Sequence, residues 1–127
     1  MRNTLFLRWA AFLGAAAVAS GAFGAHGLKP HFSEYQVSLF EKGVQYHFIH
    51  ALAILAIGLL SDRKGGLWLR VSGWLFSLGI LFFSGSLYLL ACQNLLPFSV
   101  KGIEFAAPVG GICFIGGWLV MAMGIRR

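Results

Sequence analysis

Charged residues are scarce in this chain, and their scarcity excludes several classes of protein. Only 11% of the 127 residues are charged, and just four of them are Asp or Glu. A soluble domain of this length needs far more polar surface. The sequence also contains no carboxylate pair, phosphate-binding loop or nucleophile elbow, so it gives no support for hydrolytic chemistry.

Cysteine is scarce as well. Cys92 lies near the end of the third apolar stretch, whereas Cys113 lies about 14 Å below the start of the fourth at 1.5 Å per helical residue. A hairpin of these stretches would hold the two thiols at different depths, so we expect no disulfide. Two cysteines in this spacing form neither a zinc pattern nor a haem-attachment motif.

Hydrophobic residues, by contrast, make up 58% of the chain, and its mean hydropathy is +0.78. They gather in four long stretches separated by most of the charges. A helix that crosses a bilayer needs about 20 apolar residues, so four such helices nearly use up the length. We therefore predict an all-α integral membrane four-helix bundle, with residues 1–127 as one transmembrane domain. The predicted spans cover residues 5–28, 44–60, 67–91 and 104–125.

The link between the first two spans has a pattern of its own. Pro30 ends the first span, and the residues from Ser33 to Gln36 form a capping box. The pattern predicts a short amphipathic helix lying at the membrane interface, with Gly43 as a hinge into the second span. Its apolar and charged residues are Glu34, Tyr35, Leu39, Phe40, Glu41 and Lys42.

The basic residues are distributed unequally between the two sides of the predicted bundle. The side that holds both termini and the link after the second span carries seven of them, and the other side carries three. The positive-inside rule then places both termini in the cytoplasm, with the bundle in a bacterial inner membrane. The net charge of +6 does not predict nucleic-acid binding, because these residues cluster at membrane-proximal ends. The seven are Arg2, Arg8, Arg63, Lys64, Arg70, Arg126 and Arg127, and the three are Lys29, Lys42 and Lys101.

Small residues recur at helical spacing in the first, third and fourth spans. Lipid provides no hydrophobic drive for helix association, so close backbone approach must provide it. These faces predict a tight bundle with a compact core rather than a water-filled pore. In the fourth span the small face comprises Ala106, Gly110, Cys113, Gly117 and Gly124.

The second span is unusual because its purely apolar part, residues 51–60, is too short to cross a bilayer. It must include polar residues, and His50 then lies about 16 Å from Ser61, near mid-bilayer. Polar groups at such depth usually face the bundle interior. We predict a polar cap at the outer end of the bundle, with candidate ligand-binding residues His26, Tyr46, His47, His50, Ser84, Tyr88 and Glu104.

Three interpretations of this cap are open from the sequence. The first is a hydrogen-bond network that fixes helix register. The second is a site for a lipid, a quinone or a proton, with His50 as the titratable group. The third is metal or haem ligation by His26 with His47 or His50, since histidines on facing helices can ligate haem axially.

Four motifs, one in each span, together resemble the YgdD/YwdK-like family of small inner-membrane proteins, which has eukaryotic relatives. The resemblance implies a four-helix membrane protein and no activity, because the family is generally described as uncharacterised. It also implies histidine at the His26 and His50 positions and glutamine as a familiar alternative at His47, which favours His26 and His50 as a pair. The motifs are GAFGAH (21–26), GVQYHFIHALA (43–53), FSGSLY (83–88) and PVGG (108–111) followed by GW (117–118).

These observations predict a non-enzymatic accessory or scaffold protein. Its expected partners are the lipid bilayer and either another membrane protein or a second copy of the chain. No metal and no cofactor is predicted, with haem and quinone as the alternatives. The alternative function is small-molecule binding, or transport coupled to an ion or proton, in the outer half around His26 and His50.

Overall fold

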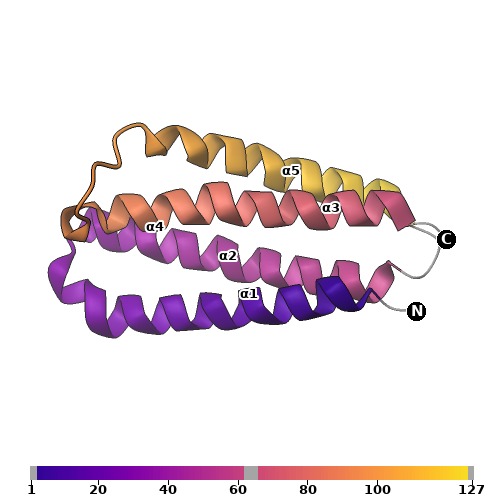
Figure 1. The fold of residues 1–127 in the computed structure, drawn as a ribbon, viewed down its shortest axis with the longest axis horizontal. Coiled ribbons are helices and arrows are strands. Elements are labelled where there is room, and N and C mark those ends of the chain that lie inside the picture. Colours follow the sequence, from indigo (N-terminus) through magenta and orange to yellow (C-terminus); the bar gives the residue numbers. More distant parts are fainter. Residues whose placement is uncertain (1–2, 62–65, 126–127) are drawn as a thin grey trace.

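Four antiparallel helical spans make up the described part of the chain (Figure 1). The computed structural model describes residues 3–61 and 66–125, and every regular element within those ranges is a helix. The first span begins with α1 (Thr4–Phe23). It continues without a break through a π-helical segment, η1 (Gly24–Leu28), and a 3-10 turn, η2 (Lys29–His31).

The second span, α2 (Glu34–Leu60), is a single helix of 27 residues. The predicted capping box is present, because Ser33 Oγ accepts from Gln36 N–H at 3.2 Å and Gln36 Oε1 accepts from Ser33 N–H at 2.9 Å. The predictions of a separate interfacial helix and of a hinge at Gly43 are therefore wrong. Gly43 lies inside α2, and its missing side chain leaves room for the ring of Tyr88, which would lie 2.9 Å from a Cβ atom there. The glycine therefore serves close packing and not bending.

The third span consists of α3 (Gly66–Gly79), a π-helical segment η3 (Ile80–Ser84) and α4 (Gly85–Ala91). Its ends agree closely with the prediction. The link to the fourth span contains two 3-10 turns and Gly102, whose φ is 90°. Only glycine adopts such a positive φ readily. The turns are η4 (Gln93–Leu95) and η5 (Ile103–Phe105), and the fourth span is α5 (Ala106–Gly124).

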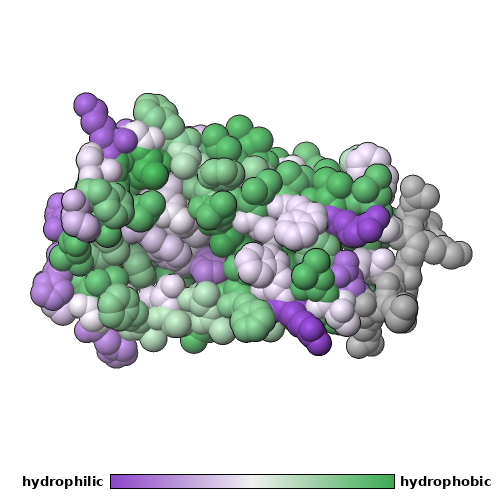
Figure 2. All heavy atoms as spheres, viewed as in Figure 1, coloured by the Kyte–Doolittle hydropathy of each residue, from purple (hydrophilic) through white to green (hydrophobic). Residues whose placement is uncertain are grey.

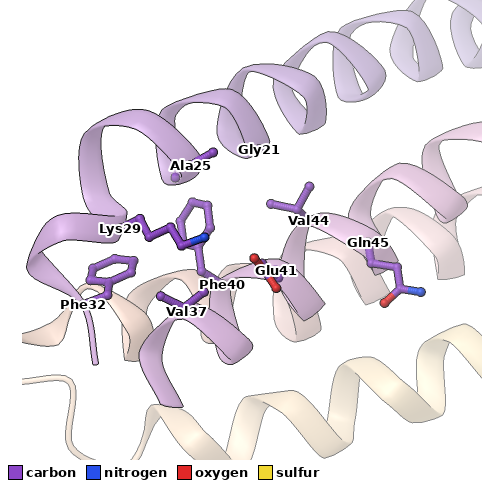
Figure 3. A pocket seen from close by; sticks show the side chains of 10 residues that line it. Gly21, Ala25, Lys29, Phe32, Val37, Phe40, Glu41, Val44 and Gln45 are labelled. Atoms are coloured by element: carbon purple, nitrogen blue, oxygen red, sulfur yellow. The ribbon is translucent and has the colours of Figure 1, made fainter. Parts of the chain in front are cut away.

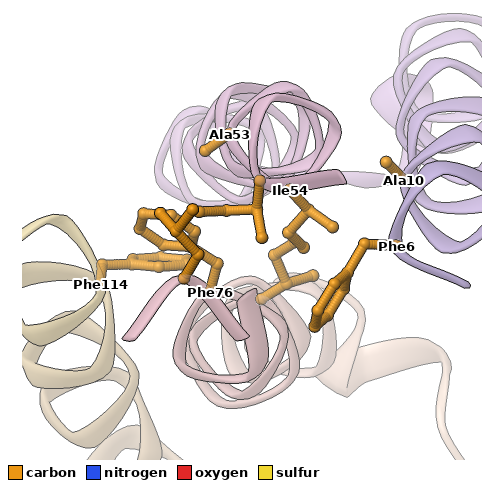
Figure 4. Close-up of a cluster of buried hydrophobic side chains, with 9 residues drawn as sticks. Phe6, Ala10, Ala53, Ile54, Phe76 and Phe114 are labelled. Carbon is orange, nitrogen blue, oxygen red and sulfur yellow. The ribbon is translucent and has the colours of Figure 1, made fainter. Parts of the chain in front are cut away.

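The four spans form a flattened bundle with α2 and α3 at its centre. Figure 4 shows α1 and α5 on opposite sides of this central pair, with Phe6 of α1 and Phe114 of α5 entering the core from those two sides. The peripheral helices therefore expose more of their surface than the central ones do. The core comprises Phe6, Ala10, Ala53, Ile54, Ile57, Leu69, Phe76, Ile80 and Phe114.

A ladder of glycines holds α5 against the third span. Gly110, Gly117 and Gly124 follow one another at intervals of seven residues. Gly117 and Gly124 face side chains of the third span and Gly110 faces the backbone of Phe83, so the two helices keep one antiparallel register. A Cβ at Gly117 would lie 2.6 Å from the ring of Phe76, so the missing side chain sets the helix separation. The predicted small face of the fourth span thus packs as expected. The pairs are Gly110 with Phe83, Gly117 with Phe76, Gly124 with Leu69 and, from the other side, Gly79 with Phe114.

The surface and the length of the helices fit a membrane. All four spans are long and apolar enough to cross one. Figure 2 shows hydrophobic side chains over the middle of one face and most hydrophilic ones near its two ends. The start of α1 and the end of α5 lie at the same end of the bundle (Figure 1). Of the seven basic residues predicted there, Arg2, Arg63, Lys64, Arg126 and Arg127 lie outside the described residues.

Candidate functional site

Both ring nitrogens of His50 have hydrogen-bond partners. Nδ1 lies 2.7 Å from the backbone carbonyl oxygen of Tyr46, and the indole N–H of Trp118 donates to Nε2 at 3.1 Å. A carbonyl can only accept and an indole N–H can only donate. The two partners therefore specify a neutral ring with its proton on Nδ1. Since Tyr46 belongs to α2 and Trp118 to α5, the ring also joins these helices.

Packing encloses the same ring. His50 is 4% exposed, and its ring stacks on that of Phe114 with centroids 3.6 Å apart and 10° between the planes. The rings of Phe76 and Trp118 approach it at centroid distances of 5.5 and 5.9 Å. This environment is more typical of a core histidine whose hydrogen bonds are satisfied than of a histidine that binds a ligand.

His47 faces a different neighbour. Its Nδ1 lies 2.9 Å from the Tyr88 hydroxyl, which connects α2 to α4. Ser20 of α1 lies beside the same hydroxyl, so three spans meet at this point. His47 is 6% exposed, yet its Nε2 has no hydrogen-bond partner among the described residues. The backbone of Leu13 lies beside the ring, but outside ordinary hydrogen-bond geometry.

Ser84 reinforces the contact between the central helices. Its hydroxyl donates to the carbonyl oxygen of Gly43 at 2.7 Å, and the π-helical turn of η3 carries it there. Ser72 makes the same kind of bond from α3 to the carbonyl of Gly117, also at 2.7 Å. Hydroxyls buried in lipid-facing bundles usually find backbone acceptors on a neighbouring helix in this way.

The remaining two predicted residues lie apart from these contacts. His26 is exposed on η1, and Glu104 is exposed on η5, where its Oε2 accepts from Gly102 N–H at 3.0 Å. His50 faces α5, on the opposite side of the bundle from the helix that carries His26. The structure therefore does not bring the predicted pair of His26 and His50 together. Five of the seven candidates contribute to contacts between helices, including Tyr46, whose exposed ring packs against Phe83 and Phe114, and the other two are exposed away from them.

This arrangement also bears on metal and haem ligation. An axial haem ligand needs a free ring nitrogen, and in this conformation His50 offers none. Within residues 3–61 and 66–125, no group of three or more His, Cys, Asp or Glu side chains is placed to hold a metal ion. Cys92 and Cys113 are both free thiols.

Sequence reasoning missed two features of this region. One is the role of Trp118 as the donor to His50, although a tryptophan that far into an apolar helix needs a hydrogen-bond acceptor when buried. The other is the pairing of Ser72 with Gly117, which a serine at depth in an apolar helix could have signalled.

Comparisons with known proteins agree with this membrane architecture. A family model described as "Protein of unknown function (DUF423)" matches residues 20–111. A UPF0382 membrane protein of Staphylococcus saprophyticus is 43% identical over 110 residues, which cover 85% of each chain. The UPF0382 inner membrane protein YgdD of Escherichia coli K12 is 36% identical over 127 residues, all of this chain and 93% of the relative. No solved structure matches the chain.

Proposed function

This chain belongs to the DUF423 family, and on that premise we propose that it is a non-enzymatic accessory or scaffold component of the bacterial inner membrane. In this role the bundle is a rigid body that another membrane protein, or a second copy, packs against. The bonding of His50 supports it, because both ring nitrogens of this buried side chain are engaged, although the ring also lines a cavity of about 600 Å³.

The observation that carries the proposal is the difference between the two peripheral helices. The outward face of α5 presents large aliphatic side chains, with Ile112, Ile115 and Leu119 each at least 63% exposed. Such side chains suit contact with lipid tails. The exposed surface of α1 also carries the large side chains of Phe12, Val18 and Phe23, but a strip of it along the groove with α2 consists of alanines. Small residues are what membrane helices use to approach one another closely. We call the exposed alanines the alanine face: Ala11, Ala15, Ala19 and Ala22.

Affinity purification in mild detergent tests this role. The tagged protein is expected to recover a stoichiometric partner or a defined oligomer. Ala19→Leu should abolish that recovery, because a larger side chain separates the helices. Ile115→Phe, an enlargement on the outward face of α5, is the matched control and should change nothing. A lone monomer across detergents and nanodiscs, or recovery unaffected by Ala19→Leu, would refute the proposal.

The orientation is part of the same proposal, with both termini in the cytoplasm. Arg8 and Arg70 are exposed on α1 and α3 near the end of the bundle that carries the termini, and Lys29, Lys42 and Lys101 lie toward the other end. The positive-inside rule favours the first end as cytoplasmic. Fusion of alkaline phosphatase to the C-terminus should give an inactive enzyme, since this reporter folds only outside the cytoplasm. An active fusion would reverse the orientation.

A further inference from the structure

We propose that the outer end of the groove between α1 and α2 is a binding site for a phospholipid whose headgroup carries both a phosphate and a primary ammonium, as phosphatidylethanolamine does. This inference goes beyond the scaffold role and does not depend on it. It concerns the groove between α1 and α2, whose apolar part is lined by Ala11, Ala15, Ala19 and Ala22 of the alanine face, so a lipid and a partner helix would compete for that part.

The headgroup site is a pocket of about 210 Å³ where the two helices meet the turn between them. Lys29 comes from the wall formed by the first span, and Glu41 comes from α2. Figure 3 shows both charged side chains directed into the same pocket, with Phe32, Val37 and Phe40 forming its apolar floor. No ion pair joins Lys29 to Glu41, so each charge is open to a ligand group of opposite sign.

Two opposite charges in one pocket select a zwitterion. A phosphate beside the Lys29 ammonium and an ammonium beside the Glu41 carboxylate would form charge-assisted contacts on opposite sides of the headgroup. An anionic headgroup such as phosphatidylglycerol satisfies only Lys29 and places its negative charge near Glu41. A quaternary ammonium has no N–H to donate to that carboxylate.

Below the headgroup pocket the groove continues as an apolar furrow. A second cavity of about 490 Å³ shares Gly21 and Val44 with the headgroup pocket, and a third of about 610 Å³ shares Val18 and Phe48 with the second. The three cavities therefore form one continuous path along α1 and α2. Small side chains of α1 create the space, and a Cβ atom at Gly14 would meet nothing within 4 Å.

The length of the furrow fits one leaflet. Between Gly21 and Ala11 the first span rises about 15 Å at 1.5 Å per residue, which is half of the roughly 30 Å hydrocarbon core. A charged pocket at the membrane surface followed by one leaflet of apolar furrow is the layout of a single phospholipid. A soluble anion or amine would leave the apolar furrow unfilled.

Native mass spectrometry of the full-length protein in mild detergent tests the site, with dioleoyl phosphatidylethanolamine, phosphatidylglycerol and phosphatidylcholine as probes. We expect phosphatidylethanolamine to bind most tightly. Glu41→Gln should weaken its binding about fivefold and should strengthen that of phosphatidylglycerol, because a repulsive charge is removed, and Lys29→Gln should weaken both about fivefold. Gly14→Leu should weaken all three by filling the furrow.

Charge-matched controls lie on the same end of the bundle outside the pocket. Lys101→Gln and Glu34→Gln remove one charge of each sign from exposed positions and should leave the lipid preference intact. Lipid adducts that follow only the bulk lipid composition would overturn the proposal. Equal binding of the three lipids, or insensitivity to both Lys29→Gln and Glu41→Gln, would do the same. If Gly14→Leu fails to fold, the two charge variants still decide the question.

Discussion

Trp118 donates its indole N–H to Nε2 of His50 at 3.1 Å, and this bond ties the central helix α2 to the peripheral helix α5. It also fixes how the imidazole can use its other nitrogen, because Nδ1 must then donate to the Tyr46 carbonyl. The indole is partly exposed, so its N–H end is inserted into the bundle while the rest of the ring faces the membrane.

Trp118→Phe should therefore destabilise the bundle. The variant removes the donor and leaves a buried imidazole nitrogen unsatisfied, while the aromatic packing is largely kept. We expect a loss of about 1 kcal/mol in the free energy of unfolding, measured by denaturant titration in mixed micelles. Trp74→Phe, which changes an exposed tryptophan with no side-chain hydrogen bond among the described residues, is the matched control. An equal effect of the two substitutions would contradict this account of Trp118.

The tautomer of His50 is a second prediction. Nitrogen-15 NMR of the protein in nanodiscs should find a neutral imidazole with its proton on Nδ1. In Trp118→Phe this preference should weaken, because only the Tyr46 carbonyl still selects it. Observation of the Nε2–H tautomer in the unsubstituted protein would mean that Trp118 does not donate to this ring.

The glycine ladder predicts opposite effects at two adjacent positions. A Cβ atom at Gly110 would overlap the backbone of Phe83, whereas one at Gly111 would meet nothing within 4 Å. Gly110→Ala should cost about 1–3 kcal/mol because the helices must separate. Gly111→Ala should be neutral or slightly stabilising through its better helix propensity. Unfolding of the two variants under identical conditions checks this, and similar values for both would argue against the ladder.

The two buried histidines should tolerate glutamine unequally. At position 47 a glutamine can keep one bond to Tyr88, and its other amide atom takes the place of a ring nitrogen that already has no partner, so His47→Gln is expected to change stability by less than about 0.5 kcal/mol. His50→Gln loses the stack on Phe114 as well as the paired bonds, and should cost about 1–3 kcal/mol. Thermal unfolding in detergent compares the two, and a larger loss for His47→Gln would reverse the assignment.

The thiol of Cys92 provides a pH-dependent test. Burial raises the pKa of the Cys92 thiol above its ordinary value of 9.0, so at neutral pH the reactive thiolate is scarcer than in a free cysteine. Alkylation by a water-soluble maleimide, measured in a Cys113→Ala background, should be slower than that of a short cysteine peptide. The difference between the two alkylation rates should become smaller only as the pH rises above 9. A rate equal to the peptide's at pH 7.5 would contradict the burial of this thiol.

The sequence was sufficient to predict four apolar helices because their number depends on apolar length, but the second helix begins at Glu34, before its predicted start at residue 44. Gly43 shows where such reasoning fails: a glycine between an amphipathic and an apolar segment reads as a hinge, yet here it admits Tyr88 to the helix surface. Which role applies depends on the helix that packs against the glycine, and the sequence does not show which helix that is.

The candidate site shows the same limit. Counting residues places both His26 and His50 in the outer half of the bundle, because depth follows from helical rise. It does not state the direction in which each side chain points. That direction depends on the order of the helices around the bundle, and the central position of α2 and α3 directs His50 toward α5 while His26 stays exposed on the first span.

The repeat of the ladder has a mechanical result. If α5 slid along the third span by less than two helical turns, Phe76 and Leu69 would meet side chains of α5 instead of Gly117 and Gly124. These two helices can therefore move only together. Since Trp118 bonds to His50 and Ser84 to Gly43, α2 is attached to the same pair, and three of the four helices are expected to respond to an applied load as one piece.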